Sequence, residues 1–192
     1  MVRDGDGLAK EGSGKRHGRR IVILLLVCFF AFGSIIAALF VYSLVHHYRA
    51  TALYEDGEKK ASVLEYRRAL LVNPFLAVDC RRMAEALASI GDYDGAISVL
   101  EKLVKTHSND AASHNDLASS LRLKGDFEKA IFEYEKAVDI DADFSLSWWG
   151  MGKCYLETGD PDKAKDCFEH ALRCAHPDSM EAKEAREYLD KL

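Results

Sequence analysis

The feature that most constrains this chain is a glycine that recurs at a fixed interval. Gly57, Gly91, Gly125 and Gly159 follow one another at spacings of 34 residues. Self-similarity at a period of this length is typical of repeat architectures, in which every copy is one small supersecondary unit. The spacing therefore predicts four copies of one unit. The copies occupy residues 43–76, 77–110, 111–144 and 145–178.

Apolar and small residues superimpose when the four copies are aligned. In the first half of a copy they recur at i, i+3, i+4 and i+7, and the second half has the same kind of period, so each copy predicts two amphipathic helices. The glycine ends the first helix by adopting positive φ, and the acidic residue after it suits the start of the second. Small residues are required where the two backbones cross closely. They are Ala50, Ala84, Ala118 and Gly152 at the eighth place, and Ser62, Ala96, Ala130 and Ala164 at the twentieth.

The pattern resembles the tetratricopeptide repeat family over about 136 of the 192 residues. The fourth copy follows the family's pattern with Trp148, Met151, Gly152, Tyr155, Gly159, Ala164, Phe168, Ala171 and Pro177. The first copy departs from it, since His46 and Arg49 replace large apolar residues and Ser62 replaces alanine. The resemblance implies an all-α fold, a right-handed solenoid of about four helix pairs. Residues 179–192 fit a first helix alone, with Arg186 where a small residue would be needed, and are expected to form a capping helix.

An apolar segment precedes the repeats. Residues 21–45 contain no Asp, Glu, Lys or Arg. As a helix they would extend about 37 Å, against about 30 Å of bilayer hydrocarbon, so we predict a transmembrane helix. Signal-peptide cleavage after Ala31-Phe32-Gly33 would leave residues 35–45 as an exposed apolar end, which favours the anchor. Because the first copy starts inside this segment, we expect its first helix to continue the transmembrane helix without a linker. His46 and His47 are expected as anchors at the membrane interface.

Charge asymmetry predicts the orientation. Residues 1–20, expected to be a disordered basic tail, contain six basic and three acidic residues, whereas residues 46–65 contain only Arg49, Lys59 and Lys60 as basic residues. The positive-inside rule then places the N-terminus in the cytoplasm and the repeats outside it, facing the periplasm in a bacterium. The four cysteines outside the apolar segment show no spacing typical of a disulfide framework, and free cysteines fit an oxidising compartment poorly. They are Cys80, Cys154, Cys167 and Cys174. An outer-membrane receptor of mitochondrial type, with its repeats in the cytosol, therefore stays an alternative.

No catalytic motif occurs in the chain. A nucleophile elbow, a phosphate-binding glycine loop and an HExxH helix are all missing from the sequence, so we predict a protein that is not an enzyme, without cofactor or small-molecule substrate. Residues 46–192 carry 20 basic and 28 acidic residues, which disfavours nucleic-acid binding. Cys167, His170 and Cys174 stand at i, i+3 and i+7 and form a weak candidate for a metal site. Three residues on one helix rarely close a tetrahedral site, so ordinary packing is favoured.

Binding is the chemistry that the family resemblance implies. Tetratricopeptide repeat proteins hold extended peptides or partner helices in a concave groove lined by the first helices. The residues expected to face this groove are Arg81, Glu85, Asn115, Ser119, Arg122, Trp149 and Lys153. An exposed Trp149 would be a binding anchor. The alternative is that Trp149 packs against the neighbouring repeat.

One family subgroup does not fit. Some co-chaperones grip a terminal carboxylate with lysines, an arginine and asparagines, and at those places this chain has Arg81, Glu85, Asp116, Leu146 and Gly150, of which two would repel a carboxylate. We therefore expect a membrane-anchored scaffold that holds a protein or peptide partner and assists the assembly of an envelope or membrane complex. The alternative is a constitutive structural subunit of a larger membrane complex, held by its transmembrane helix.

Overall fold

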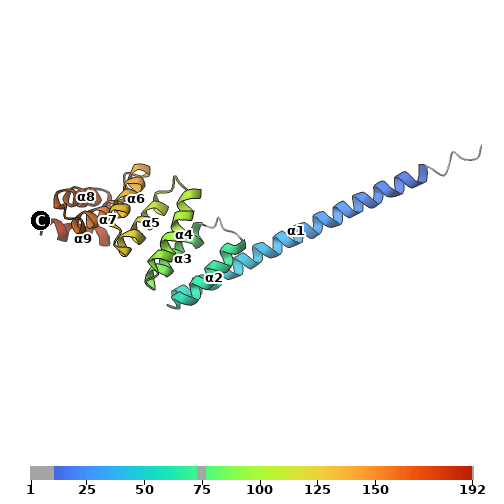
Figure 1. Cartoon of the computed structure of the whole chain (residues 1–192), viewed down its shortest axis with the longest axis horizontal. Helices are drawn as coiled ribbons and strands as arrows, with labels where there is room; N and C mark the ends of the chain where they lie inside the picture. The colour runs from blue at the N-terminus through green and yellow to red at the C-terminus, as the bar shows by residue number, and fades with distance from the viewer. Residues whose placement is uncertain (1–10, 73–76, 192) are drawn as a thin grey trace, which may run out of the picture.

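The computed structural model describes the backbone of residues 11–72 and 77–191, and side chains from residue 33 onward. Within this part of the chain the backbone forms nine α-helices and no strand (Figure 1). The helices are α1 (Glu11–Glu55), α2 (Lys59–Val72), α3 (Ala77–Ser89), α4 (Tyr93–Thr106), α5 (Ala111–Lys124), α6 (Phe127–Ile140), α7 (Ser145–Glu157), α8 (Pro161–Cys174) and α9 (Met180–Leu189).

Helix α1 is 45 residues long and has no break. Its C-terminal part, from about residue 43, packs against α2 as the first helix of the first copy, and the rest projects away from the domain (Figure 1). The structure thus has the uninterrupted helix expected between the apolar segment and the repeats. Residues 11–20, expected to be a disordered tail, are the first turns of α1. Residues 1–10 of that tail lie outside the described residues.

The other helices stack in chain order. Each copy is a helix pair, and the second helix of each pair also packs against the first helix of the next, while α9 packs against α8 and α7. Contacts of this kind, made only between neighbours, are typical of a solenoid. The structure therefore confirms the all-helical repeat architecture.

The recurring glycines make the turn inside each pair. Gly57, Gly91, Gly125 and Gly159 have φ between 79° and 94°. In this left-handed region a side chain is strained, and glycine is the residue that adopts it freely. An acidic residue follows each of these glycines, and two of them cap the second helix: the Asp92 carboxylate accepts a hydrogen bond from the Gly95 amide at 2.9 Å, and Asp160 accepts one from the Lys163 amide. The predicted role of the glycines is confirmed.

Small residues stand where the paired helices cross. Ala84, Ala96, Ala118 and Ala130 are all buried. At the equivalent place in the fourth copy, a Cβ added to Gly152 would lie 2.7 Å from the Phe168 ring, closer than side chains pack. Large side chains fill the space beside these crossings, with Tyr66, Tyr134 and Phe168 almost fully buried. The core is one large cluster along the first three copies and part of the fourth, and a smaller cluster around Phe168 and α9; the partly buried Tyr155 packs against both.

The predicted transmembrane segment lies partly outside the described side chains, because those of residues 21–32 are not described. Within the described residues, no helix combines the length and apolar character needed to cross a bilayer. In the remainder of the segment, eight large apolar side chains are exposed. They are Ile35, Ile36, Leu39, Phe40, Val41, Tyr42, Leu44 and Val45.

Candidate functional site

A hollow of about 440 Å³ opens between α3 and α5, on the side of the first helices. Three of the residues predicted to face the groove line it, namely Arg81, Glu85 and Ser119. Val78 and Leu123, both exposed, lie at the same hollow and add apolar surface. The hollow therefore offers charged and apolar side chains together, which is the surface that a peptide or protein segment requires.

Charged pairs fix the walls of the hollow. Arg81 Nε on α3 donates to Asp116 Oδ2 on α5 at 2.7 Å, so this ion pair joins the second and third copies. Burial raises the pKa of Asp116, and Arg81 opposes that effect. Between the first and second copies, the Tyr54 hydroxyl donates a hydrogen bond to the Glu85 carboxylate. Burial and this hydrogen bond raise the pKa of Tyr54 to about 12, so the donor stays protonated. Glu85 and Asp116, which argued against carboxylate binding, are thus engaged in pairs within the fold.

Asn115 was predicted to face the groove, but it lies in the interior. It is 8% exposed, and its Oδ1 accepts a hydrogen bond from the Ser147 hydroxyl on α7 at 3.1 Å. Asn115 therefore joins the third and fourth copies through a buried contact. Ser119, one turn further along α5, is half-buried and shares a 3.0 Å hydrogen bond with the Tyr134 hydroxyl.

Trp149 is half-buried and packs against neighbouring helices, as in the alternative considered from the sequence. Its ring is partly buried against the cluster of Ala164, Phe168 and Ala185, so it packs toward α8 and α9. Two cations lie near the ring: the Arg122 guanidinium carbon at 5.7 Å from the centroid and Lys153 Nζ at 4.4 Å. These are distances at which cation–π attraction operates. Trp149 Nε1 and Arg122 Nε are buried without a hydrogen-bond partner in the described part of the protein. Trp149, Arg122 and Lys153 thus form one basic aromatic cluster.

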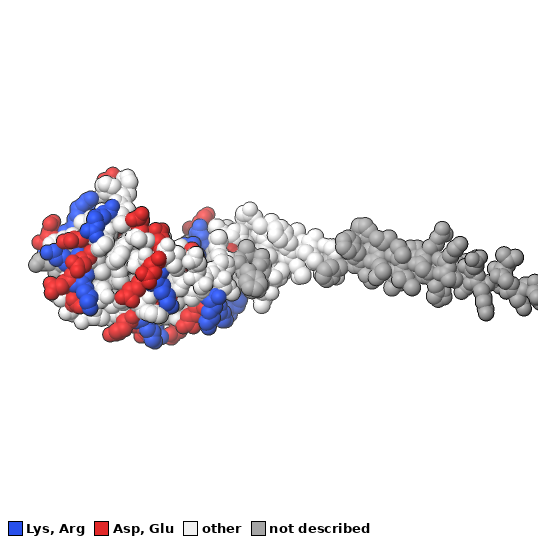
Figure 2. Space-filling view, turned by 90° about the horizontal axis from the view of Figure 1, so that it is seen from above, with Lys and Arg blue, Asp and Glu red and all other residues white. Residues whose placement is uncertain are grey.

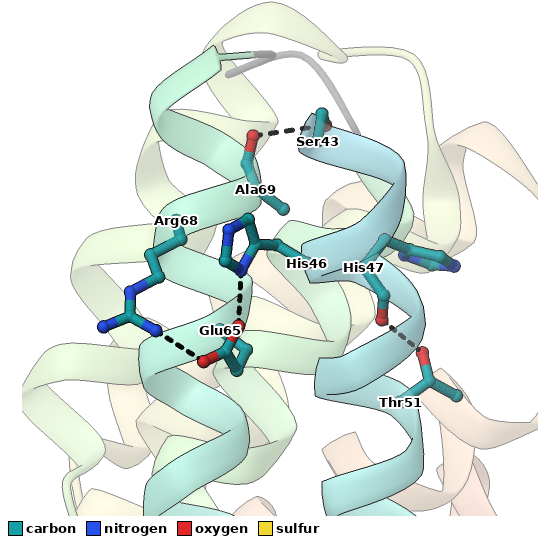
Figure 3. Close-up of polar contacts among 7 residues, drawn as sticks. All are labelled: Ser43, His46, His47, Thr51, Glu65, Arg68 and Ala69. Atoms are coloured by element: carbon teal, nitrogen blue, oxygen red, sulfur yellow. Dashed lines mark hydrogen bonds and ion pairs between the residues drawn. The ribbon is translucent and has the colours of Figure 1, made fainter. Parts of the chain in front are cut away.

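A second polar site lies where α1 joins the repeats (Figure 3). His46 points toward α2, with its Nδ1 2.5 Å from Glu65 Oε2, and Arg68 donates to the other Glu65 oxygen at 2.6 Å. The hydrogen bond from His46 lowers the pKa of Glu65. His47 points away from α2 and pairs with the fully buried Asp79 of α3. Both histidines thus hold α1 to its neighbours, and their place at a membrane interface stays a prediction.

Sequence reasoning missed that this pairing recurs in the third copy. His114 Nδ1 lies 2.7 Å from Glu133 Oε2, and Lys136 pairs with Glu133 in the way that Arg68 pairs with Glu65 in the first copy. A signal was present, because His114 follows His46 by twice the repeat period and Glu133 follows Glu65 by the same interval. Alignment of polar as well as apolar places would have found it.

The weak metal candidate is not assembled. Cys167 is buried in the core, whereas the His170 ring stacks on Trp148 with 4.4 Å between centroids. Cys174 Sγ lies instead near Asp143, at 3.7 Å from its Oδ1. Across the described residues, no group of three potential ligands is placed to hold a metal ion. The cysteines described, namely Cys80, Cys154, Cys167 and Cys174, are free thiols.

Known proteins share this architecture. The relatives include the DnaJ homolog subfamily C member 7 of Mus musculus, 26% identical over 113 residues, which are 55% of this chain and 23% of the relative. The protein O-mannosyl-transferase TMTC1 of Mus musculus is 30% identical over 120 residues, or 60% of this chain and 13% of the relative. The chain thus spans less than a quarter of the length of either protein.

Solved structures agree in fold. A MamA crystal structure gives a TM-score of 0.66 at 17% identity, covering 78% of this chain and 85% of MamA. The PilF structure of Pseudomonas aeruginosa gives 0.67 at 19% identity, covering 80% and 70%. Two tetratricopeptide repeat family models match residues 81–143 and 121–187. Because the matched residues form the stacked helix pairs described above, the chain belongs to the tetratricopeptide repeat family.

Proposed function

We propose that this protein is a membrane-anchored adaptor, whose groove holds a segment of a partner protein while α1 keeps it at a membrane. Tetratricopeptide repeat proteins generally act as scaffolds for protein interactions. The observation that carries the proposal is the unbroken α1, which joins an exposed apolar segment directly to the helix stack that bears the hollow. Confinement to one surface raises the effective concentration of the partner, so weak groove contacts suffice.

The exposed part of α1 supports the anchor. Its apolar side chains between residues 35 and 45 lie at consecutive as well as spaced positions, so they surround the helix. A helix that is apolar on all sides belongs in a protein core or in a membrane. Every described side chain of α1 before Ser43 is exposed. We assign residues 21–45 to the bilayer, with the basic N-terminus cytoplasmic and the repeats outside the cytoplasm, for which the bacterial inner membrane facing the periplasm is the best match.

Cys174 offers a test of this orientation. It is half-buried, whereas Cys80, Cys154 and Cys167 are buried, so Cys174 is the reporter among the described thiols. In intact cells, a maleimide that passes the outer membrane but cannot cross the inner membrane should modify Cys174 if the repeats are periplasmic. Protection until lysis would reverse the orientation and support the receptor-like alternative with cytosolic repeats.

The groove supports a protein or peptide partner. Exposed Val78 and Leu123 flank the charged side chains of Arg81 and Glu85, a mixture suited to an amphipathic segment. The proposal assigns no catalysis, cofactor, small-molecule substrate or nucleic acid to this protein, in line with its acidic repeats.

Leu123→Glu tests the groove. Leu123 lines the hollow and is 48% exposed, so a charge there should weaken partner capture while the fold persists. Phe132→Glu is the matched control, because Phe132 is 56% exposed on α6 and does not line the hollow. Affinity capture in mild detergent with mass spectrometry should lose specific partners only with Leu123→Glu. Equal capture by wild type and both variants would contradict groove binding.

The second candidate is a structural subunit held by its transmembrane helix, favoured by the apolar surface all around α1. Replacing the anchor with an unrelated apolar helix separates the two functions. The exchange should stop at residue 41, because Ser43 is buried and bonded to the Ala69 carbonyl. Retained capture supports the groove, and lost capture supports the subunit.

A further inference from the structure

The polar contacts at the junction fix how α2 lies against α1. Ser43 Oγ donates to the Ala69 carbonyl at 3.3 Å, and His46 lies 2.5 Å from Glu65. Residue numbers fall along α2 as they rise along α1, so the two helices are antiparallel. Continuing this register by two residues places Leu71 level with about Val41, inside the apolar segment 21–45.

Two exposed apolar side chains lie at this end of the domain. Leu71, in the last turn of α2, is 77% exposed, and Val78, in the first turn of α3, is 58% exposed. The pair of His47 with Asp79 places Val78 level with about His46, directly after the apolar segment. Leu71 is therefore level with the end of the apolar segment of α1, and Val78 is level with the first residue after it.

Arginines gather at the same end. By the same register they lie level with residues 44–50 of α1, a span of about 9 Å. They are Arg49, Arg67, Arg68, Arg81 and Arg82. Figure 2 shows basic side chains on the part of the domain next to the apolar helix.

Few acids offset this charge. The neighbouring Glu65 and Asp79 are buried and paired with histidines. Arg68 also contacts Glu65, Arg81 pairs with Asp116, and Glu85 lies one turn beyond Arg82 on α3. Arg49 and Arg67 make no ion pair with another described residue, and they supply the excess of positive charge. The exposed acids Glu55 and Glu58 lie in and beside the turn after α1, at its far end.

We infer that this end of the domain, formed by the C-terminus of α2 and the N-terminus of α3, rests on a bilayer surface that carries anionic lipid headgroups. Leu71 enters the boundary between headgroups and acyl chains, and Arg49 and Arg67, which are exposed, contact the lipid phosphates. Basic side chains near an anionic leaflet are attracted to it, and apolar side chains beside them add burial. The inference rests on the proposed function, because residues 21–45 must cross the bilayer.

A depth measurement on the full chain tests it. Cys28 and Cys174 are replaced by serine, and a polarity-sensitive fluorophore is attached at Leu71→Cys, at Phe40→Cys as the anchor position, or at Phe132→Cys as an exposed control on α6. The protein is reconstituted in vesicles of phosphatidylcholine alone or with phosphatidylglycerol, and quenching by nitroxide-labelled lipid is measured. We expect strong quenching at Phe40 in both lipids, strong quenching at Leu71 in the anionic vesicles, and none at Phe132.

A charge variant tests the arginines. Arg67→Gln should lower the ratio of docked to undocked protein, read from the quenched fraction at residue 71, about fivefold in anionic vesicles. Arg173→Gln, an exposed arginine on α8, is the matched control and should leave it unchanged.

The outcomes separate the inference from the proposed function. Quenching at Phe40 with none at Leu71 would leave the anchor standing and overturn the surface contact. Absence of quenching at Phe40 would overturn the anchor and the contact with it. Equal quenching at Leu71 in both lipids, or equal effects of the two arginine variants, would overturn the role of the charges.

Discussion

The first and last helix pairs fill the same three places of the repeat with different chemistry. The first pair has His46, Glu65 and Arg68, joined in one polar chain. The last pair has Trp148, Cys167 and His170, in which Cys167 is buried and the two rings stack. Both sets connect the two helices of a pair. The repeat therefore requires a contact of the right reach at these places, and either a polar chain or packed rings supplies it.

The difference lies in what each contact demands. Packing in the last pair, where Phe168 also stacks on Tyr188 of α9 at 5.1 Å, uses stacked rings and no ion pair among these residues. The polar chain of the first pair requires each charged group to keep its partner, because a buried charge without one is costly. The first pair is therefore the more sensitive to its surroundings, and it is the pair fused to the apolar helix.

The largest expected effect is the loss of packing in the last pair. Phe168→Ala removes a fully buried ring, and we expect it to lower the free energy of unfolding by about 4 kcal/mol. Phe132→Ala makes the same chemical change at an exposed position and should cost less than about 1 kcal/mol. Denaturant unfolding in detergent measures both. Similar costs for the two variants would mean that Phe168 does not hold the last pair together.

Breaking the polar chain should cost somewhat less. Glu65→Ala removes the carboxylate that the half-buried His46 and Arg68 share, and we expect a loss of about 3 kcal/mol. Replacing both residues by leucine gives the first pair the apolar chemistry of the last, and the double variant should be at least as stable as wild type. Glu58→Ala, at an exposed acid next to the same turn, is the control. A double variant less stable than Glu65→Ala would show that the first pair needs the ions themselves.

A smaller effect is expected from acid. His46 holds the pKa of Glu65 below its usual 4.5, so the stabilising contribution is present above that pH and is lost as the pH falls through the lowered pKa. Wild type should therefore lose stability below about pH 4 more steeply than the variant with leucine at both places. Thermal unfolding followed by circular dichroism over a pH series measures the slopes. Parallel slopes would remove Glu65 from the acid response.

The smallest effect concerns thiol reactivity. Burial raises the pKa values of Cys154 and Cys167 to about 12, so little thiolate forms near neutral pH. In the native protein both should alkylate about tenfold or more slowly than the half-buried Cys174. Mass spectrometry of peptides after timed iodoacetamide treatment gives the rates. Fast modification of Cys167 would mean that the last pair opens readily.

The sequence alone predicted most of the fold, because the solenoid follows from local rules. The positive φ of Gly91 and the close approach of Gly152 to Phe168 are properties of one pair, and residue spacing reveals them. The repeat period also predicted which helices pair.

The site was less predictable, because its geometry depends on contacts between copies. A helical face predicts direction but not depth, so Asn115 was expected in the groove although Ser147 of the next copy holds it in the interior. The contacts of His46 and His47 within the fold were not predicted, because their acidic partners are 19 and 32 residues away in the chain. Trp149 was ambiguous for the same reason, since its environment includes Ala185 of α9, which lies outside its own repeat.

The continuity of α1 has a mechanical consequence. Because α1 has no break between the apolar segment and the first helix pair, the solenoid rotates together with α1 as one rigid unit. Rotation of α1 about its long axis would turn the hollow through the same angle, so a protein that binds the exposed apolar residues 35–45 would set the direction in which the hollow faces.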